Sequence, residues 1–290
     1  MPGTNTTTTE LLKKYNFPIQ KKYGQNFLID DNILSGIVNA AGIEPRDVVL
    51  EIGPGLGALT GRLCRAASQG RVIAVEIDKM LIPILQESLQ DHQNLTVIHA
   101  DILKVNIREL IRDLEEGTRI KVVANLPYYI TTPILMELLK TQSIIQSITV
   151  MVQKEVAERM KEQPGSKSYG ALSLAVQFYA EVQYVMTVSR NCFLPRPDVD
   201  SAVVRLDIYQ PEDRPARPED PEQMFRLIRA AFNQRRKTLV NALYNSPELS
   251  CSKEEIQAAL RGMDLPETVR GEALTLSDYA GLSDRLFTKP

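Results

Sequence analysis

Short runs of apolar residues alternate with amphipathic stretches along the first half of the chain. The amphipathic stretches, such as 78–90, repeat apolar residues at helical spacing. Each apolar run is continuous, which is typical of a strand buried on both faces of a sheet. Strand–helix alternation of this kind predicts an α/β fold with a parallel sheet between helices. The predicted strands cover residues 48–52, 72–75, 95–98, 120–124 and 147–152.

The pattern changes in the second half of the chain. Residues 182–188 and 201–208 are typical of strands, and the loop between them is too short for a helical crossover, so we expect them to pair antiparallel. Beyond residue 220 the chain is typical of helices, with 221–244 taken as one helical stretch. Residues 209–223 are rich in proline and charge, as linkers are. We therefore predict a disordered lead-in over 1–9, an α/β domain over 10–208, a linker over 209–223 and a helical domain over 224–290.

Composition narrows the class of protein. With 290 residues, 43% of them hydrophobic, the chain can bury a sizeable core without disulfides or metals. No apolar stretch is long enough to span a membrane, and the first residues lack the features of a secretory signal. Three scattered cysteines suit a reducing cytoplasm, so we expect a cytoplasmic protein with no membrane contact. Two histidines and no metal-type cysteine spacing argue against a metal site.

Charge is distributed unevenly. The net charge of −2 argues against a nucleic-acid partner for the molecule as a whole. Basic residues nevertheless gather in two places, Lys21 and Lys22 near the start and Arg235, Arg236 and Lys237 within the helical pattern. Either group could be an ordinary solvated surface. A local basic patch can also bind phosphate on an acidic protein, so both groups are candidates for an RNA backbone.

Polar residues follow four of the predicted parallel strands. Gly53 begins a G-x-G-x-G turn after the first strand, and Glu76, Asp101 and Asn125 end the next three. Each alone could be a tight turn or a helix cap. Because the carboxyl ends of parallel strands share one edge of a sheet, where ligands bind in open α/β folds, the four together predict a binding site.

The glycine turn alone fits a dinucleotide, a nucleoside cofactor or a simple turn. An acidic residue about 20 positions further on, as Glu76 is, commonly binds ribose hydroxyls. The predicted edge offers carboxylates and few cations, which would repel a pyrophosphate. S-adenosylmethionine, with its ribose, adenine amine and sulfonium, tolerates acidic surroundings. The pattern therefore favours S-adenosylmethionine over NAD.

The stretch Asn125-Leu126-Pro127-Tyr128 indicates the second ligand. The Asn125 amide oxygen and the Leu126 carbonyl can both accept hydrogen bonds, Pro127 fixes the backbone, and Tyr128 offers a ring face. Together they suit an exocyclic amine on a planar base, a poor nucleophile whose lone pair two acceptors can direct at a methyl donor. The alternative is a simple turn in which Asn125 is an incidental cap.

The sequence resembles the rRNA adenine N6,N6-dimethyltransferases, in particular the bacterial KsgA/RsmA family that modifies 16S rRNA. The resemblance spans nearly the whole chain. It rests on the stretches KKYGQNFLID (21–30), VLEIGPGLGALT (49–60), VIAVEID (72–78), HADIL (99–103), VANLPYYITTPIL (123–135), FLPRPDVDSAVVRL (193–206) and FNQRRKTLVNAL (232–243).

The resemblance implies a Rossmann-like class I S-adenosylmethionine-dependent methyltransferase domain and a small all-helical C-terminal RNA-binding domain. It implies dimethylation of N6 of two adjacent adenosines in the 3′-terminal hairpin of 16S rRNA, late in small-subunit biogenesis. The implied substrate is 16S rRNA within the 30S subunit or its precursor, and the implied state is a monomer. Loss of the modification goes with altered kasugamycin sensitivity in this family.

The resemblance also assigns roles to individual residues. The implied cofactor contacts are Asn26, Leu28, Gly53, Glu76, Asp101 and Asn125. The implied catalytic residues are Asn125, Leu126, Pro127 and Tyr128, with Phe193 as the aromatic on the other side of the target base. Physical reasoning alone would make Phe193 a core residue.

Three alternatives remain at this point. An Erm-type 23S rRNA methyltransferase would share the first domain, but FNQRRKTLVNAL fits the 16S group better. A non-catalytic ribosome assembly factor would not need an intact NLPY stretch. An NAD-dependent dehydrogenase would need a hydride-transfer group at a strand edge, which the stretch around residues 125–133 does not supply.

Overall fold

The computed structural model describes residues 10, 14–15, 20, 23–115 and 117–287. Lys21, Lys22 and the expected lead-in over 1–9 lie outside these residues. The chain forms two compact units. One contains the described residues up to Ala157 together with Val182–Ile208, and the other contains Glu158–Glu181 together with the described residues from Tyr209 onward. No helix in the described part of the chain is long and apolar enough to cross a membrane.

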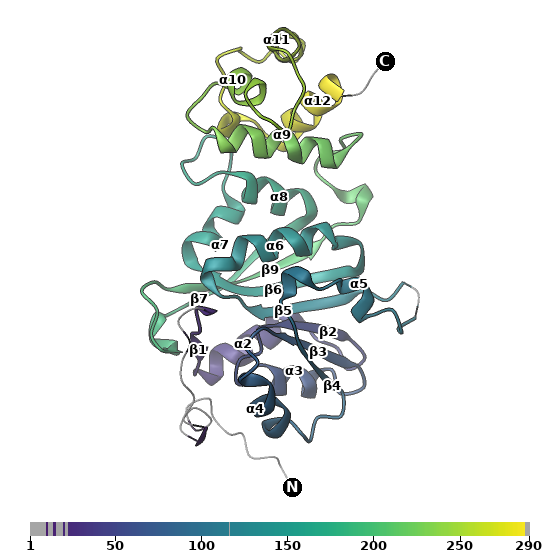
Figure 1. Ribbon diagram of the computed structural model, residues 1–290, viewed down its shortest axis with the longest axis vertical. Helices are drawn as coiled ribbons and strands as arrows, with labels where there is room; N and C mark the ends of the chain where they lie inside the picture. Colours follow the sequence, from purple (N-terminus) through teal and green to yellow (C-terminus); the bar gives the residue numbers. More distant parts are fainter. Residues whose placement is uncertain (1–9, 11–13, 16–19, 21–22, 116, 288–290) are drawn as a thin grey trace. The chain divides into compact units, whose positions relative to one another are not determined.

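A seven-stranded sheet forms the centre of the first unit, in the order β4-β3-β2-β5-β6-β9-β7 (Figure 1). The first five strands in this order are parallel, and β9 runs antiparallel to β6. All five predicted strands are confirmed, and β7 and β9 are neighbours as expected. The strands are β2 (Val48–Ile52), β3 (Arg71–Glu76), β4 (Leu95–His99), β5 (Ile120–Asn125), β6 (Ile145–Gln153), β7 (Ala180–Val188) and β9 (Ser201–Ile208).

Helices cover the sheet because the central strands are apolar on both faces. All five residues of β2 are buried. Helix α2 (Asp31–Ala41) and helix α3 (Thr60–Ala66) contribute to one core cluster with Val49 of β2 and Val123 of β5. The remaining helices of the predicted alternation are α4 (Leu81–Ser88), α5 (Ile107–Leu110) and α6 (Thr131–Lys140). The expected α/β architecture is confirmed.

Two short strands, distant in sequence, form a separate two-stranded sheet. Strand β1 (Phe27–Leu28) pairs antiparallel with β8 (Phe193–Leu194), so that Leu28 lies opposite Phe193. The pairing ties the segment before α2 to the segment before β9. It therefore brings together two of the stretches, GQNFL and FLPRP, that carry the family resemblance.

Helices make up the second unit: α8 (Ala171–Tyr179), α9 (Pro221–Asn233), α10 (Leu239–Tyr244), α11 (Lys253–Arg261) and α12 (Leu276–Phe287), with the end of α7 (Lys154–Lys161). The Phe178 ring of α8 meets Phe225 of α9 edge-on, with centroids 5.4 Å apart. Residues 158–181 thus group with the C-terminal helices, although they precede the predicted linker. Of that linker, 211–213 form a 3-10 turn, and α9 already begins at Pro221.

The expected unbroken helix over 221–244 is wrong. Helix α9 ends at Asn233 and α10 begins at Leu239, with Arg235, Arg236 and Lys237 in the turn between them. Thr238 explains the break, because its side chain accepts a hydrogen bond from the Asn241 amide as the N-cap of α10. The sequence carries a sign of this turn, since no apolar residue occurs between Phe232 and Leu239, but the helical pattern on either side was read as one stretch.

Candidate active site

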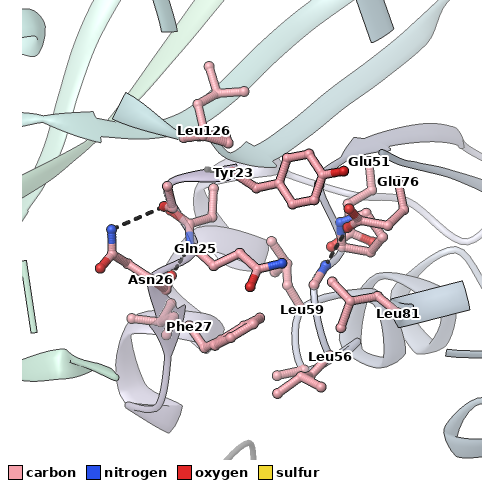
Figure 2. Close-up of a pocket in the computed structure, with 18 of the residues that line it drawn as sticks. Tyr23, Gln25, Asn26, Phe27, Glu51, Leu56, Leu59, Glu76, Leu81 and Leu126 are labelled. Carbon is pink, nitrogen blue, oxygen red and sulfur yellow. Dashed lines mark hydrogen bonds between the residues drawn. The ribbon is translucent and has the colours of Figure 1, made fainter. Parts of the chain in front are cut away.

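A hollow that is open to solvent lies at the carboxyl ends of β2, β3 and β5 (Figure 2). The segment 23–28 forms a further wall. The polar side chains that line it are Tyr23, Gln25, Asn26, Glu51, Glu76, Asn125 and Tyr128. None of the described lining residues is Lys or Arg. The hollow is therefore acidic, which suits a cationic nucleoside cofactor and disfavours a pyrophosphate.

The glycine turn after β2 gives backbone access to this hollow. Gly53 has φ +69°, and a Cβ placed there would meet nothing closer than the Asn125 carbonyl, 4.0 Å away. The position thus faces open space. Gly57 has φ +87° for a different reason: a Cβ there would lie 2.9 Å from Leu89. Gly53 leaves room for a ligand, whereas Gly57 lets the start of α3 pack on α4.

Glu76 at the end of β3 is held as a fixed acceptor. Its Oε1 accepts from the Asp78 amide at 2.8 Å, and its Oε2 accepts from the Gly55 amide at 3.2 Å. Burial raises the pKa of this carboxyl, while the backbone hydrogen bonds oppose the rise. A carboxylate oriented by two amides at a strand end is suited to accept from ribose hydroxyls. The geometry fits the role expected for Glu76.

Glu51 is a site residue that the sequence reasoning missed. It lies in the middle of an apolar strand, is 1% exposed and lines the hollow. Its Oε2 atom has no hydrogen-bond partner among the described residues. Burial raises its pKa to about 8, the neighbouring Thr60 hydroxyl opposes the rise, and the nearby Glu76 charge adds to it. A buried acceptor without a partner fits a ligand that carries a positive charge, as S-adenosylmethionine does.

Gln20 and the segment 23–28 are attached to the sheet through Asp78, a second feature that was missed. The buried Asp78 carboxylate accepts from Gln25 Nε2 at 2.8 Å and from Gln20 Nε2 at 3.1 Å. Asn26 and Leu28 follow directly and both line the hollow, as expected of cofactor contacts. The only sequence signal was a second acid, Asp78, two residues after Glu76.

Asn125 and Leu126 present two acceptors at the end of β5. The Asn125 Nδ2 atom donates to the Asn26 carbonyl at 3.3 Å. This leaves Oδ1 as an acceptor, and within the described residues no group donates to it or to the Leu126 carbonyl. The Leu126 side chain is buried and its amide donates to the Met151 carbonyl at 3.1 Å. The two acceptors therefore have fixed positions and unused capacity.

Pro127 and Tyr128 complete this corner. The Pro127 carbonyl accepts from the Ile130 amide at 3.2 Å and from Thr131 Oγ1 at 3.1 Å, which closes the 3-10 turn Tyr128–Ile130. Tyr128 is half-buried and lines the hollow, and its hydroxyl lies 2.6 Å from Ser201 Oγ. Burial raises the pKa of the phenol, so the ring stays neutral.

Two predicted site residues do not line the hollow. Asp101 caps a 3-10 turn, accepting from the Leu103 amide at 3.1 Å, and lies 4.0 Å from the Lys104 ammonium. Phe193 is 3% exposed and belongs to a core cluster with Leu28 and Leu34. In this structure Asp101 is a turn cap and Phe193 is a core residue, which are the roles that physical reasoning alone would give them. Their roles in binding adenine therefore stay predictions.

The basic turn after α9 is not uniform. Arg235 Nε pairs with Glu272 at 2.8 Å, and its Nη2 donates to the Ser166 carbonyl at 3.3 Å. Arg236 and Lys237 are exposed. No described acidic side chain pairs with either of them. Two of the three expected RNA contacts are therefore available to solvent, while the third holds the turn.

Sheet order, glycine turn, fixed carboxylate and NLPY corner together define a Rossmann-like methyltransferase that uses a nucleoside cofactor. The family model described as ribosomal RNA adenine dimethylase matches residues 16–278, and the chain belongs to this family. The reaction and cofactor expected from the sequence, methyl transfer from S-adenosylmethionine to adenine in ribosomal RNA, are confirmed. An NAD-dependent dehydrogenase is excluded.

Individual relatives agree with the family. The chain is 54% identical over 283 residues to the ribosomal RNA small subunit methyltransferase A of Lachnoclostridium phytofermentans, covering 97% of this chain and 96% of the relative. It is 28% identical to a dimethyladenosine transferase structure from Plasmodium falciparum (88% and 95% covered, TM-score 0.71). It is 26% identical to the structure of the 23S rRNA methyltransferase ErmE (90% and 99% covered, TM-score 0.63).

Proposed function

We propose that this protein dimethylates N6 of two adjacent adenosines in the 3′-terminal hairpin of 16S rRNA, within the 30S subunit or its precursor, as a cytoplasmic monomer. The observation that carries the proposed chemistry is the corner at the end of β5. Two acceptors with unused capacity, Asn125 Oδ1 and the Leu126 carbonyl, lie beside the ring of Tyr128. An adenine amine offers two hydrogens and an aromatic plane, which match these groups.

The proposed mechanism follows from the low nucleophilicity of the adenine amine. The N6 lone pair is delocalised into the purine ring, so the amine is a weak nucleophile. Hydrogen bonds from N6 to Asn125 and Leu126 favour a pyramidal nitrogen whose lone pair points away from both acceptors. Bound S-adenosylmethionine supplies a methyl group on a positively charged sulfur. Positioning and electrostatics then carry the step, and no general base is needed before methyl transfer.

Residues around the hollow divide the remaining tasks. Glu76 accepts from the ribose, Gly53 allows the backbone to approach the cofactor, and Glu51 faces its positive charge. Tyr128 stacks on the target adenine, which has to leave its helix to reach the pocket. Stacking of this kind contributes about 1–3 kcal/mol per base.

We propose small-subunit rather than large-subunit rRNA as the substrate because of the sequence identity to relatives. Identity is 54% to a relative named for the small subunit and 26% to ErmE, which acts on 23S rRNA. The RNA backbone contacts we propose are Lys21, Lys22, Arg236 and Lys237. Arg235 we assign to holding the turn, because it is already paired with Glu272.

The test is direct. Labelled S-adenosylmethionine is offered with small subunits that lack the modification and, in parallel, with large-subunit RNA, and the label is mapped to nucleotides. We expect two dimethylated adenosines near the 3′ end of 16S rRNA. Label in 23S rRNA alone would favour the Erm-type activity, and no label in either RNA would favour the assembly factor; either result would overturn the proposal.

A further inference from the structure

We propose that Ser201 is a positioning residue for methyl transfer, because its hydroxyl holds the ring of Tyr128 in place beside the two amine acceptors. The inference rests on the proposed function, since it requires Tyr128 to be the surface on which the target adenine stacks. Ser201 itself does not line the hollow. It acts through Tyr128.

The contact is short and sheltered. Tyr128 Oη and Ser201 Oγ are 2.6 Å apart, at the close end of the range for hydroxyl–hydroxyl hydrogen bonds. Ser201 is 0% exposed, so water does not compete for the pair. The phenol hydroxyl is therefore hydrogen-bonded to Ser201 and takes no part in the reaction. What remains for the adenine is the face of the ring, which needs no hydroxyl.

The ring is consequently anchored at both ends. Its Cα belongs to the 3-10 turn closed by the Pro127 carbonyl, and its Oη is bound to Ser201. A ring attached only through Cα can swing about its side-chain torsions. A ring attached at both ends keeps its plane, and the position of a stacked base is set by that plane.

Ser201 is a firm anchor because it begins a strand of the main sheet. It lies opposite Gln153 of β6, and the preceding Asp200 carbonyl accepts from the Lys154 amide at 3.0 Å. The Asp200 side chain also accepts from the Arg190 amide at 2.9 Å. Hydrogen bonds to Lys154 and Arg190 thus hold the backbone at the start of β9, where Ser201 lies.

The same sheet carries the acceptors. Asn125 of β5 lies opposite Met151 of β6, and Met151 lies opposite Val203 of β9, two residues beyond Ser201. One continuous set of strand pairings therefore fixes both the acceptors for N6 and the far end of the stacking ring. The Ser201 hydroxyl links the Tyr128 ring to these paired strands. This link sets the distance between the stacked adenine and the two acceptors for N6.

Loss of the anchor has a specific consequence. In the second methylation N6 already carries a methyl group and has one N–H left to donate to Asn125 Oδ1 or the Leu126 carbonyl, so this step depends more on the placement of the base and tolerates less displacement than the first. A loosened ring should therefore slow both steps and slow the second one more. Monomethyladenosine should accumulate, which a general loss of stability would not produce.

The test is a double-mutant cycle of Ser201→Ala, Tyr128→Phe and both together. Tyr128→Phe keeps the ring face on which the base stacks, so both single changes remove only the hydrogen bond. We expect each to lower kcat/KM about 10-fold, and the double variant to lose no more than either single one. The monomethyl fraction should rise in all three while the Kd for S-adenosylmethionine is unchanged.

Ser147→Ala is the matched control. Ser147 is also buried, lies on β6 of the same sheet, and its Oγ has no hydrogen-bond partner among the described residues. It should keep wild-type turnover and product ratio. Wild-type turnover and product ratio in Ser201→Ala, or losses that multiply in the double variant, would overturn the inference. If Ser201→Ala does not fold, Tyr128→Phe decides alone, with wild-type behaviour again overturning it.

Tyr128→Ala separates this inference from the proposed function. If Tyr128→Ala is strongly impaired while Ser201→Ala behaves as wild type, stacking stands and only the anchor is wrong. If Tyr128→Ala turns over normally, the stacking role itself is wrong and the inference falls with it.

Discussion

The side-chain amide of Asn125 donates to the main-chain carbonyl of Asn26, 3.3 Å away and 99 positions earlier in the chain. The bond occupies the Nδ2 group and directs Oδ1 away from Asn26. The bond also connects the two expected binding sites. Asn26 belongs to the segment expected to bind the cofactor, and Asn125 belongs to the corner expected to bind the target adenine. Orientation of the amine acceptor thus depends on the cofactor segment being in place.

Replacing Asn125 should therefore affect turnover more than cofactor binding. In Asn125→Ala we expect kcat to fall about 100-fold or more, because the acceptor acts chiefly in the transition state, and the Kd for S-adenosylmethionine to rise less than about 10-fold. Single-turnover methylation and equilibrium binding measure the two quantities. Asn39→Ala, at an exposed helical position, is the control. Near-normal turnover in Asn125→Ala would remove Asn125 from the mechanism.

Gly53→Ala should weaken cofactor binding beyond its effect on stability. The positive φ of +69° makes alanine there unfavourable by roughly 1 kcal/mol, and the added methyl group would occupy space at the hollow. Gly117→Ala is a matched control, since Gly117 has φ +85° and nothing within 4 Å. Both variants should lose similar stability, and only Gly53→Ala should raise the Kd for S-adenosylmethionine. Equal Kd values in the two variants would count against cofactor contact at Gly53.

Glu51 should make stability depend on pH in an unusual direction. Its pKa is about 8 in the folded protein against an ordinary 4.5, so between these values the folded state holds a proton that the unfolded state has released. The contribution is complete below pH 4.5 and is lost as pH rises through about 8. In Glu51→Gln, which stays neutral, the Tm measured without cofactor should fall less over this window.

The size of that difference should be several degrees, since Tm moves by about 2–4 °C per kcal/mol in chains of this order of size. Thermal unfolding from about pH 4 to about pH 9, which brackets the window, measures it. The gap between variant and wild type should widen towards the folded-state pKa of about 8 and then level off. Parallel profiles would show that Glu51 is already ionised in the folded protein.

The basic turn after α9 should divide into one structural and two RNA-binding residues. Neutralising Arg236 and Lys237 together should flatten the dependence of log K on log salt for RNA binding by about 1.5, at roughly 0.7–0.9 per phosphate contact. Arg235→Gln should leave the slope unchanged and lower stability by less than about 1 kcal/mol, because its ion pair with Glu272 is partly exposed. An unchanged slope in the Arg236 and Lys237 variant would place the RNA elsewhere.

Sequence reasoning reached the parts of this protein that depend on local pattern. Continuous apolar runs located the strands, and the rule that ligands bind at the carboxyl ends of parallel strands brought Gly53, Glu76 and Asn125 to one hollow. In each case the residues themselves carry the physical signal.

What escaped prediction depends on contacts between distant segments. Periodicity cannot show that Gln25 binds Asp78, or that β1 pairs with β8. Glu51 was hidden because a single acid within an apolar strand looks like an interruption, whereas burial without a partner is visible only in three dimensions. The helix break at Asn233 was missed for a different reason, since the polar run 233–238 was read as the exposed face of one helix.

The pairing of β1 with β8 also orders events during synthesis. Leu28 leaves the ribosome early, but its partner Phe193 follows 165 positions later. Ser201, the anchor proposed for Tyr128, comes later still. A nascent chain that ends before Phe193 would carry the glycine turn, Glu76 and the NLPY corner, yet neither the strand that pairs with the cofactor segment nor the hydroxyl that holds the ring. This ribosomal RNA methyltransferase would therefore acquire its complete pocket only after about two-thirds of the chain has been translated.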